Sequence, residues 1–339
     1  MSECTSNYFI RSNSSIGYVS FFESNFSRLD TVVRLNGYPS FVMADIAGNL
    51  CADALEQGFH VQLIHNCLDN SLEGVIIPER NAGVINFPLY DEEEYSIAAI
   101  LNDEYLTLTY AALEAARRHF AAAREIHDRW EKIYIANMDF EAANKLAADM
   151  IQKVIGENTL PKKGEQIHRF FGAATIDGSL DYIDGLTSHL QKRYFIKGRP
   201  GTGKSTFLHK IAEAACAAGY EVEVYHCAFD PNSLDMIVLR ELDLCMFDST
   251  PPHEYFPFLP NDEVVDIYKE AVVDKTDEKY RGEIAAIMTE YKSEIARATR
   301  QLIRAKRNYD EVQRGILSKV NAEAFGNIEK KIHDQVFGT

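Results

Sequence analysis

Residues 198–206 read Gly198-Arg199-Pro200-Gly201-Thr202-Gly203-Lys204-Ser205-Thr206, which fits the P-loop pattern G-x-x-x-x-G-K-S. A short apolar run precedes this stretch and a helical pattern follows it, as a P-loop requires. The glycines let successive backbone N–H groups curl round a phosphate, and the helix N-terminus adds the positive end of its dipole. We expect the whole stretch to bind a nucleoside triphosphate. Lys204 is predicted to reach its β- and γ-phosphates, and the Ser205 hydroxyl to ligate Mg²⁺.

The overall composition limits the classes of partner. The chain has 339 residues with a formal net charge of −16, which argues against binding the phosphate backbone of a nucleic acid. No apolar run approaches the length of a membrane span, and the first residues do not resemble a signal peptide. The six cysteines show no C-x-x-C pair. We therefore predict a cytoplasmic protein with reduced cysteines, no nucleic-acid partner and no membrane partner.

An internal repeat organises the chain. When the sequence is shifted by 161 residues, Gly37 falls on Gly198, Gly58 on Gly219 and Asp69 on Asp230, among many other matches between residues 8 and 69. Residues 139–156 match residues 321–338 at a larger offset, so the second copy carries about twenty additional residues before its terminal helices. We predict two copies of one module, residues 1–160 (the first half) and 161–339 (the second half), joined near residues 161–164.

Each copy repeats the pattern of an α/β protein. Each copy begins with a β-rich segment, residues 8–22 or 168–183, in which Asp177-Gly178 is predicted to form a hairpin turn. A strand, the loop at residues 37–44 or 198–206, a helix that ends at Gly58 or Gly219 and a second strand follow. This order predicts a parallel sheet of the P-loop NTPase type in each copy. About three parallel strands are recognisable per copy, so we expect the two copies to complete their core together.

Long helices are predicted at the end of each copy. Apolar residues recur at spacings of three and four through residues 106–134 and 280–316, with charged residues around them. The favoured interpretation is that the two long helices pack on each other or on the α/β core. The alternative is a projecting coiled coil that binds a protein partner.

The first copy lacks the residues that a phosphate site needs. In place of Gly201, Gly203, Lys204 and Ser205 it has Ser40, Val42, Met43 and Ala44. The lysine charge, the metal-ligating hydroxyl and the close-approach glycines are lost together. We therefore predict that the first half does not bind a nucleoside triphosphate.

A P-loop enzyme also needs an acidic residue at a strand end that holds Mg²⁺ through water. The apolar run at residues 242–247 ends in Asp248, and the first copy has Asn86 at that position. The acid is therefore absent from the copy that lacks the lysine. We predict Asp248 as this residue, with a structural turn aspartate as the alternative.

The segment 226–235 follows the second strand and should open onto the sheet edge where ligands bind. Asp230 or Asp235 could orient an attacking water or accept a substrate proton, and we predict Asp230 as catalytic. His226 and Asp230 are matched by His65 and Asp69 in the first copy, which favours a structural role for His226 and makes a structural role for Asp230 an equal alternative. Weaker candidates are His253, near the γ-phosphate, and three possible charge stabilisers, Arg193, Arg199 and Arg240.

Three segments together resemble a family: residues 197–206 (K-G-R-P-G-T-G-K-S-T), 225–235 (Y-H-C-A-F-D-P-N-S-L-D) and 247–254 (F-D-S-T-P-P-H-E). The whole chain resembles a poorly characterised bacterial family of tandem P-loop ATPase-like proteins. The resemblance implies ATP binding and hydrolysis by a cytosolic protein. It also implies a P-loop in each half, and this sequence departs from that pattern at residues 37–44.

Three functions are open at this stage. The first is a Mg²⁺-dependent ATPase in the second half, with the first half as a pseudo-enzyme packed against it. The second is a small-molecule kinase, in which residues 257–280 form part of an acceptor pocket or lid. The third is an ATP-sensing scaffold with negligible turnover, whose helices bind a protein partner. No N-K-x-D guanine signature is found, which favours ATP over GTP.

Overall fold

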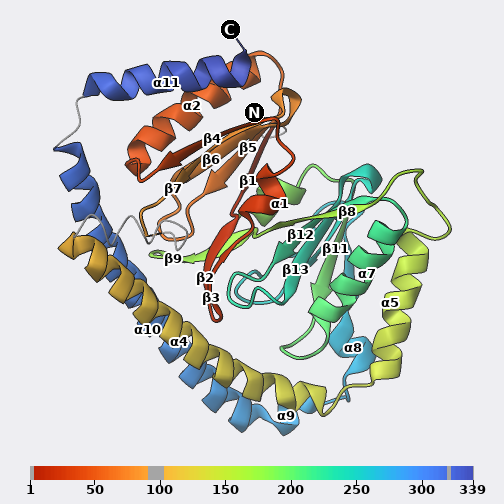
Figure 1. Cartoon of the computed structure of the whole chain (residues 1–339). Coiled ribbons are helices and arrows are strands. Elements are labelled where there is room, and N and C mark those ends of the chain that lie inside the picture. The colour runs from red at the N-terminus through yellow and green to blue at the C-terminus, as the bar shows by residue number, and fades with distance from the viewer. Residues whose placement is uncertain (1–3, 91–102, 319–321, 339) are drawn as a thin grey trace.

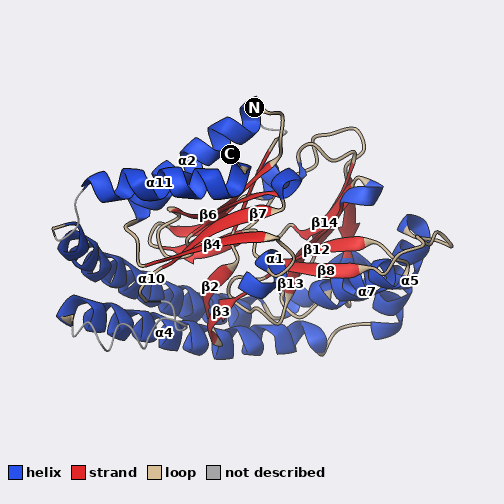
Figure 2. Cartoon of the chain, turned by 45° about the horizontal axis from the view of Figure 1, so that its top comes forward, coloured by secondary structure: helices blue, strands red, loops and turns tan. Residues whose placement is uncertain are grey.

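A computed structural model describes residues 4–90, 103–318 and 322–338. Figures 1 and 2 show two α/β units above a pair of long helices. In the first half the elements are β1 (Thr5–Tyr8), β2 (Arg11–Ser14), β3 (Gly17–Ser20), α1 (Phe22–Phe26), β4 (Thr31–Asn36), α2 (Ser40–Glu56), β5 (Val61–His65), β6 (Leu72–Ile77), η1 (Pro78–Arg80), β7 (Ala82–Phe87), α4 (Glu104–Ile135) and α5 (Phe140–Val154).

The second half repeats this order with an insertion. Its elements are β8 (Glu165–Arg169), β9 (Gly172–Thr175), β10 (Gly178–Asp181), α6 (Ile183–Thr187), β11 (Lys192–Lys197), α7 (Lys204–Ala217), β12 (Glu221–His226), β13 (Leu234–Leu239), η3 (Arg240–Leu242), β14 (Leu244–Asp248), β15 (Glu263–Asp266), α8 (Ile267–Ala271), α9 (Thr276–Lys279), α10 (Arg281–Leu317) and α11 (Ala322–Phe337). The bounds of β9, β10, α6 and β11 are those of β2, β3, α1 and β4 shifted by 161 residues. The insertion forms β15, α8 and α9. The two long helices predicted from the apolar spacing are α4 and α10.

The main sheets are mixed, and the prediction of parallel sheets is therefore wrong in one respect. Among the described residues the strand orders are β1-β5-β6-β7-β4 in the first half and β15-β11-β14-β13-β12-β8 in the second. Strands β6 and β13 run antiparallel to their neighbours, while the other pairings are parallel. The short turns η1 and η3 explain this, because a tight connection joins only antiparallel strands. Each turn ends at a residue with positive φ, Asn81 or Asp243.

The two halves meet around an approximate two-fold axis. Phe9 and Phe170, which are equivalent in the repeat, each donate a backbone N–H to the other's carbonyl, at 2.9 and 2.8 Å. The Ser15 N–H donates to the Phe229 carbonyl, and the equivalent Ile176 N–H donates to the Leu68 carbonyl. Such reciprocal contacts are those of an isologous dimer interface, here within one chain. One core cluster contains side chains of both halves, including Tyr8, Phe26, Phe171 and Tyr225, in agreement with the expectation of a shared core.

The helices α4 and α10 pack along each other in an antiparallel pair that runs beneath both sheets (Figure 1). Their direction follows from the contacts, since His119 pairs with Glu294 while Tyr134 lies in a cluster with Ile287. Buried residues of both helices form one apolar cluster: Leu106, Leu113, Ala116 and Phe120 with Ala298, Leu302, Ala305 and Tyr309. The favoured interpretation of the apolar seam is thus confirmed.

The terminal helices are exchanged between the halves. Helix α5 belongs to the first half, yet its Ala147 and Met150 pack in the core of the second half with α7. Helix α11 belongs to the second half, yet its Ile332 and Val336 pack in the core of the first half with α2. Figure 1 shows α11 beside α2 and α5 beside α7. Each α/β unit therefore needs a helix from the other half to cover its apolar surface. The predicted joint at residues 161–164 lies in the loop between α5 and β8, and the predicted domain boundary stays a prediction.

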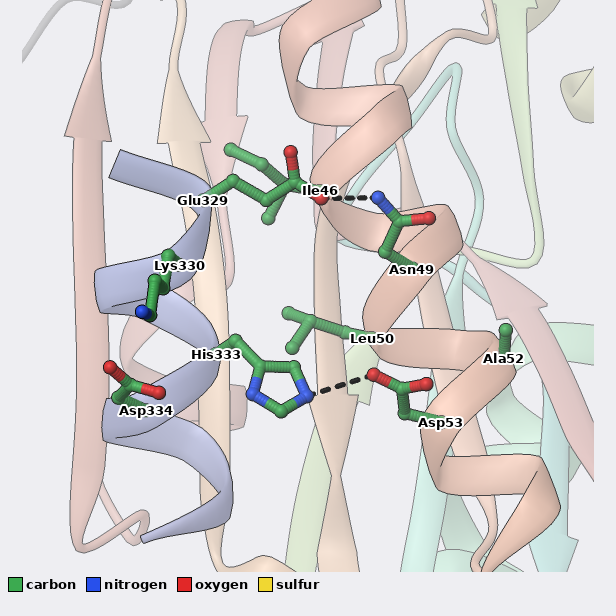
Figure 3. A pocket seen from close by; sticks show the side chains of 9 residues that line it. All are labelled: Ile46, Asn49, Leu50, Ala52, Asp53, Glu329, Lys330, His333 and Asp334. Atoms are coloured by element: carbon green, nitrogen blue, oxygen red, sulfur yellow. Dashed lines mark hydrogen bonds and ion pairs between the residues drawn. The ribbon is translucent and has the colours of Figure 1, made fainter. Parts of the chain in front are cut away.

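Polar contacts also hold α11 on α2 (Figure 3). His333 Nε2 lies 2.8 Å from Asp53 Oδ2, and the Asn49 amide donates to the Glu329 carboxylate. A groove lined by these residues, together with Lys330 and Asp334, lies between the two helices. None of the helices in the described segments combines the length and the apolar character needed to span a bilayer.

Candidate functional site

The P-loop connects β11 to α7, as the sequence predicts. Gly201 and Gly203 have φ values of +77° and +81°, a conformation that glycine adopts without strain. A Cβ atom on Gly198 would lie 2.5 Å from Thr202 Oγ1 and 3.1 Å from the Lys204 side chain. The buried Thr202 hydroxyl donates to the Arg199 carbonyl at 2.8 Å and accepts from the Arg199 N–H at 3.1 Å. These hydrogen bonds between Thr202 and Arg199 fix the conformation of the loop.

Lys204, Ser205 and Asp248 lie together at the end of the loop. The Lys204 ammonium is 3.5 Å from Asp248 Oδ2 and donates to the Arg199 carbonyl at 3.0 Å. Ser205 Oγ accepts from the Leu234 N–H at 2.9 Å, which ties the start of α7 to the start of β13. Strand β14, which ends in Asp248, pairs directly with β11. The structure thus brings together the three residues predicted to bind the phosphates and the metal.

Asp235 joins this group from β13. The register pairs Met236 with Phe247, so Asp235 and Asp248 are the next cross-strand neighbours. Burial and the negative charge of Asp248 raise the pKa of Asp235 to about 6, against the opposing effects of His253, of a hydrogen bond with Cys227 and of the Lys204 charge. In the first half the equivalent carboxylate, Glu73, accepts from buried Arg11 at 2.9 Å. The second half has Gly172 in place of Arg11, so it lacks this neutralising partner.

Asp230 lies in a different environment. Its carboxylate accepts from Arg124 of α4 at 2.7 Å. In the first half the equivalent Asp69 pairs with Lys306 of α10 at 3.5 Å. Because the pair recurs where the lysine of the P-loop is missing, the geometry favours a role for Asp230 in holding a long helix in place.

His226 also has an equivalent arrangement in both halves. Its Nδ1 lies 2.6 Å from the Pro231 carbonyl and its Nε2 lies 2.8 Å from His168. His65 makes the corresponding contacts with the Asn70 carbonyl and Asn7, at 3.1 and 2.9 Å. Burial lowers the pKa of His226 to about 4, so this imidazole is neutral at physiological pH. These contacts support a structural role.

Each of the weaker candidates has a polar partner of its own. His253 Nδ1 lies 2.7 Å from Asp181, which also accepts from Tyr255. Arg193 donates twice to buried Asp262, and Arg240 donates twice to Glu223. Arg199 donates to Asp277 at 2.8 Å, and this carboxylate also accepts from the Tyr134 hydroxyl. Arg199 therefore connects the P-loop to the end of α4 and to the insertion before α10. The Asp91 counterpart of His253 lies outside the described residues.

Helix α4 of the first half approaches the P-loop of the second, which the sequence did not indicate. A Cβ atom on Gly201 would lie 2.5 Å from the carbonyl oxygen of Glu131, so the loop touches the helix backbone there. Burial alone would raise the pKa of Glu131, but the hydrogen bond with His127 and the charges of Arg124 and Lys204 lower it. His127 and Glu131 lie one helical turn apart. The apolar spacing of residues 106–134 did not predict that this part of the helix would contact the second-half loop.

The first-half loop has a different backbone. Helix α2 begins at Ser40, which is equivalent to Gly201, whereas α7 begins at Lys204. Asn86, in place of Asp248, accepts from the Tyr38 N–H at 3.2 Å and donates to the Tyr38 carbonyl at 2.8 Å. Met43, in place of Lys204, is fully buried in an apolar cluster with Leu50 and Val336. The loop positions are thus part of a helix and its core.

No protein-family model, curated protein or solved structure matches this chain. The second-half loop offers two glycines with positive φ, a lysine whose ammonium lies 3.5 Å from Asp248, and oxygen atoms from Ser205, Asp235 and Asp248. Hard oxygen donors suit Mg²⁺, and a glycine loop that precedes a helix suits a phosphate chain. The described residues therefore fit a metal-bound nucleoside triphosphate.

Proposed function

We propose that the second half binds Mg²⁺-ATP and hydrolyses it, while the first half binds no nucleotide. The observation that carries this proposal is the grouping of Lys204, Ser205 and Asp248 at a glycine loop. All three are replaced in the first half, where Met43 is buried in the core and Asn86 bonds to the loop backbone. Loss of the whole set from one copy indicates that its members serve a common purpose in the other.

The residues have distinct roles in this proposal. The backbone N–H groups of residues 198–206 surround the phosphates, and Lys204 offsets their charge. Ser205 and Asp248 would hold Mg²⁺, which supplies charge neutralisation at the phosphate oxygens. Asp235 would accept a proton from the attacking water, because a carboxylate with a pKa of about 6 is ionised at neutral pH and still basic enough for this task. Asp230 acts through Arg124 and helix α4.

Titration calorimetry with Mg²⁺-ATP tests the binding step. We expect one nucleotide per chain for the wild type and a loss of affinity of about 10- to 100-fold for Lys204→Ala, since charge-assisted hydrogen bonds to phosphate disappear. The matched control is Met43→Leu at the equivalent position, which should leave affinity and stoichiometry unchanged. Equal ATP affinity in wild type and Lys204→Ala, or two nucleotides per chain, would contradict the proposal.

ADP release separates hydrolysis from the other functions that the sequence leaves open. Release without an added acceptor supports hydrolysis. Release only with a metabolite panel present would indicate a kinase, and tight binding with no release would indicate a sensing scaffold. Replacing ATP with GTP in the same assay tests the preference for adenine.

A further inference from the structure

Helix α4 of the first half carries one carboxylate to the phosphate loop of the second half. The close approach of Gly201 to the Glu131 backbone fixes this part of the helix against the loop. Arg124, on the same helix, pairs with Asp230 and so fixes the helix against the loop between β12 and β13. These two contacts fix the Glu131 backbone beside the loop. Its carboxylate lies 3.2 Å from His127 Nδ1 and 3.9 Å from Arg124 on the same helix, and, against the effect of burial, the charges of His127, Arg124 and Lys204 all lower its pKa.

The other half of the chain provides an internal comparison. Under the offset of 182 residues that relates α5 to α11, Arg124 corresponds to Lys306 and Glu131 to Gln313. The equivalent residues also make equivalent contacts in the structure. Lys306 pairs with Asp69, as Arg124 pairs with Asp230, and Gln313 lies against Ser40, as Glu131 lies against Gly201. The two helices thus approach the two loops in the same way.

The two equivalent positions differ in charge. The cation that holds the helix is present in both halves, as Arg124 and Lys306. The carboxylate Glu131 is present only beside the loop with Lys204, and the first-half loop with Met43 faces the neutral Gln313. Packing alone does not require this difference, because glutamate and glutamine have nearly the same shape. The counterpart of His127 is Tyr309, so the ion pair of His127 with Glu131 occurs only at the second-half loop, as the phosphate-site residues do.

We propose that Glu131 is a positioning residue of the second-half nucleotide site, contributed by the first half. In this proposal the contact with Gly201 places the negative charge of Glu131 beside the loop, where it attracts the Lys204 ammonium and sets its position. This inference rests on the proposed ATP site and adds a reason for the first half to be retained: its helix completes the site. Because a carboxylate near a phosphate chain also repels it, Glu131 improves turnover at some cost in ATP affinity.

The substitution Glu131→Gln tests this inference, since it installs the side chain that already packs at the equivalent position. We expect turnover to fall about tenfold, because Lys204 is less well placed. We expect the Kd for Mg²⁺-ATP to fall about threefold, because one negative charge is removed. Glu131→Asp should recover part of the turnover. The matched control, Gln313→Glu, should change neither quantity.

The outcomes are distinguishable. Glu131→Gln with turnover and Kd both within twofold of wild type would overturn the inference, and so would reduced turnover with unchanged or weaker ATP affinity. The affinity measurement remains decisive even if turnover is too slow to follow. If Lys204→Ala also leaves ATP affinity unchanged, the proposed function itself fails. If Lys204→Ala weakens binding while Glu131→Gln has no effect, only the role of Glu131 is lost.

Discussion

The two loops of this chain occupy equivalent places in equivalent sheets, yet their backbones differ. The second-half loop has two glycines with positive φ and delays the start of α7 until Lys204. The first-half loop turns at Gly37, where a Cβ atom would lie 2.6 Å from Leu89, and α2 begins at Ser40. Residues 201–203 precede α7, whereas the equivalent residues 40–42 form the first turn of α2. The two loops therefore differ in backbone conformation as well as in charge.

Several contacts are the same in both halves of the duplicated chain. The reciprocal backbone bonds at Phe9 and Phe170, the histidine contacts and the pairs of Asp69 and Asp230 with the long helices occur in both halves. These features hold the two halves together. The features found in only one half, Lys204, Ser205, Asp248 and Glu131, surround one loop. Structure common to both copies is thus separable from chemistry confined to one.

The largest effect is expected from Met43→Lys, which gives the first-half loop the missing lysine. Met43 is fully buried in an apolar cluster, so the new charge has no partner and no route to solvent. We expect the free energy of unfolding in urea to fall by about 3 kcal/mol or more, with no second nucleotide bound. Met43→Leu, as the control, should cost less than about 1.5 kcal/mol. A stable Met43→Lys protein that binds two nucleotides would show that the first-half loop is not closed.

Asp248→Asn gives the second-half site the residue that the first half has at the equivalent position, Asn86. Loss of the carboxylate should lower turnover by on the order of 100-fold and raise the Mg²⁺ concentration needed for half-maximal rate. The measurement is ADP release over a Mg²⁺ titration. Asn86→Asp in the first half is the matched control and should leave turnover unchanged. If Asp248→Asn showed the Mg²⁺ dependence of the wild type, Asp248 would not be a ligand of the metal.

The pH dependence tests Asp235. If its ionised carboxylate is the base, turnover should fall about tenfold for each pH unit below the pKa of Asp235, which burial and the Asp248 charge raise above the ordinary value for aspartate. Asp248→Asn should move this inflection to lower pH, because the Asp248 charge helps to raise the pKa of Asp235. The same shift affects stability: with a folded pKa above the unfolded value, stability is lost as the pH rises through about 6. Asp235→Asn should therefore make the protein more stable at pH 7.5 while lowering its turnover, and a rate independent of pH between 5 and 8 would argue against Asp235.

The smallest effect is expected from breaking the pairs that hold the long helices. Asp230→Asn and Asp69→Asn should each lower the free energy of unfolding by about 1 kcal/mol, since both carboxylates bond to a partly exposed cation. Thermal or urea unfolding of the two variants checks this. Asp230→Asn should also lower turnover a few-fold through α4, and Asp69→Asn should not. Abolished turnover in an Asp230→Asn protein of unchanged stability would restore the catalytic prediction for Asp230.

The sequence by itself determined the loop, the repeat, the order of elements and the two long helices. These follow from local signals: glycine spacing, apolar periodicity and residue matches at a constant offset. The grouping of Lys204 with Asp248 was also predictable, because it depends on the loop and the end of a neighbouring strand.

Only the tertiary structure decided the rest. The direction of β6 and β13 depended on short turns whose Asn81 and Asp243 were not recognised as turn residues. The exchange of α5 and α11 and the approach of Glu131 to Gly201 join segments far apart in the chain. Local spacing records which face of a helix is apolar, but it does not record which of two similar sheets that face will cover. That choice depends on long-range packing of the whole chain.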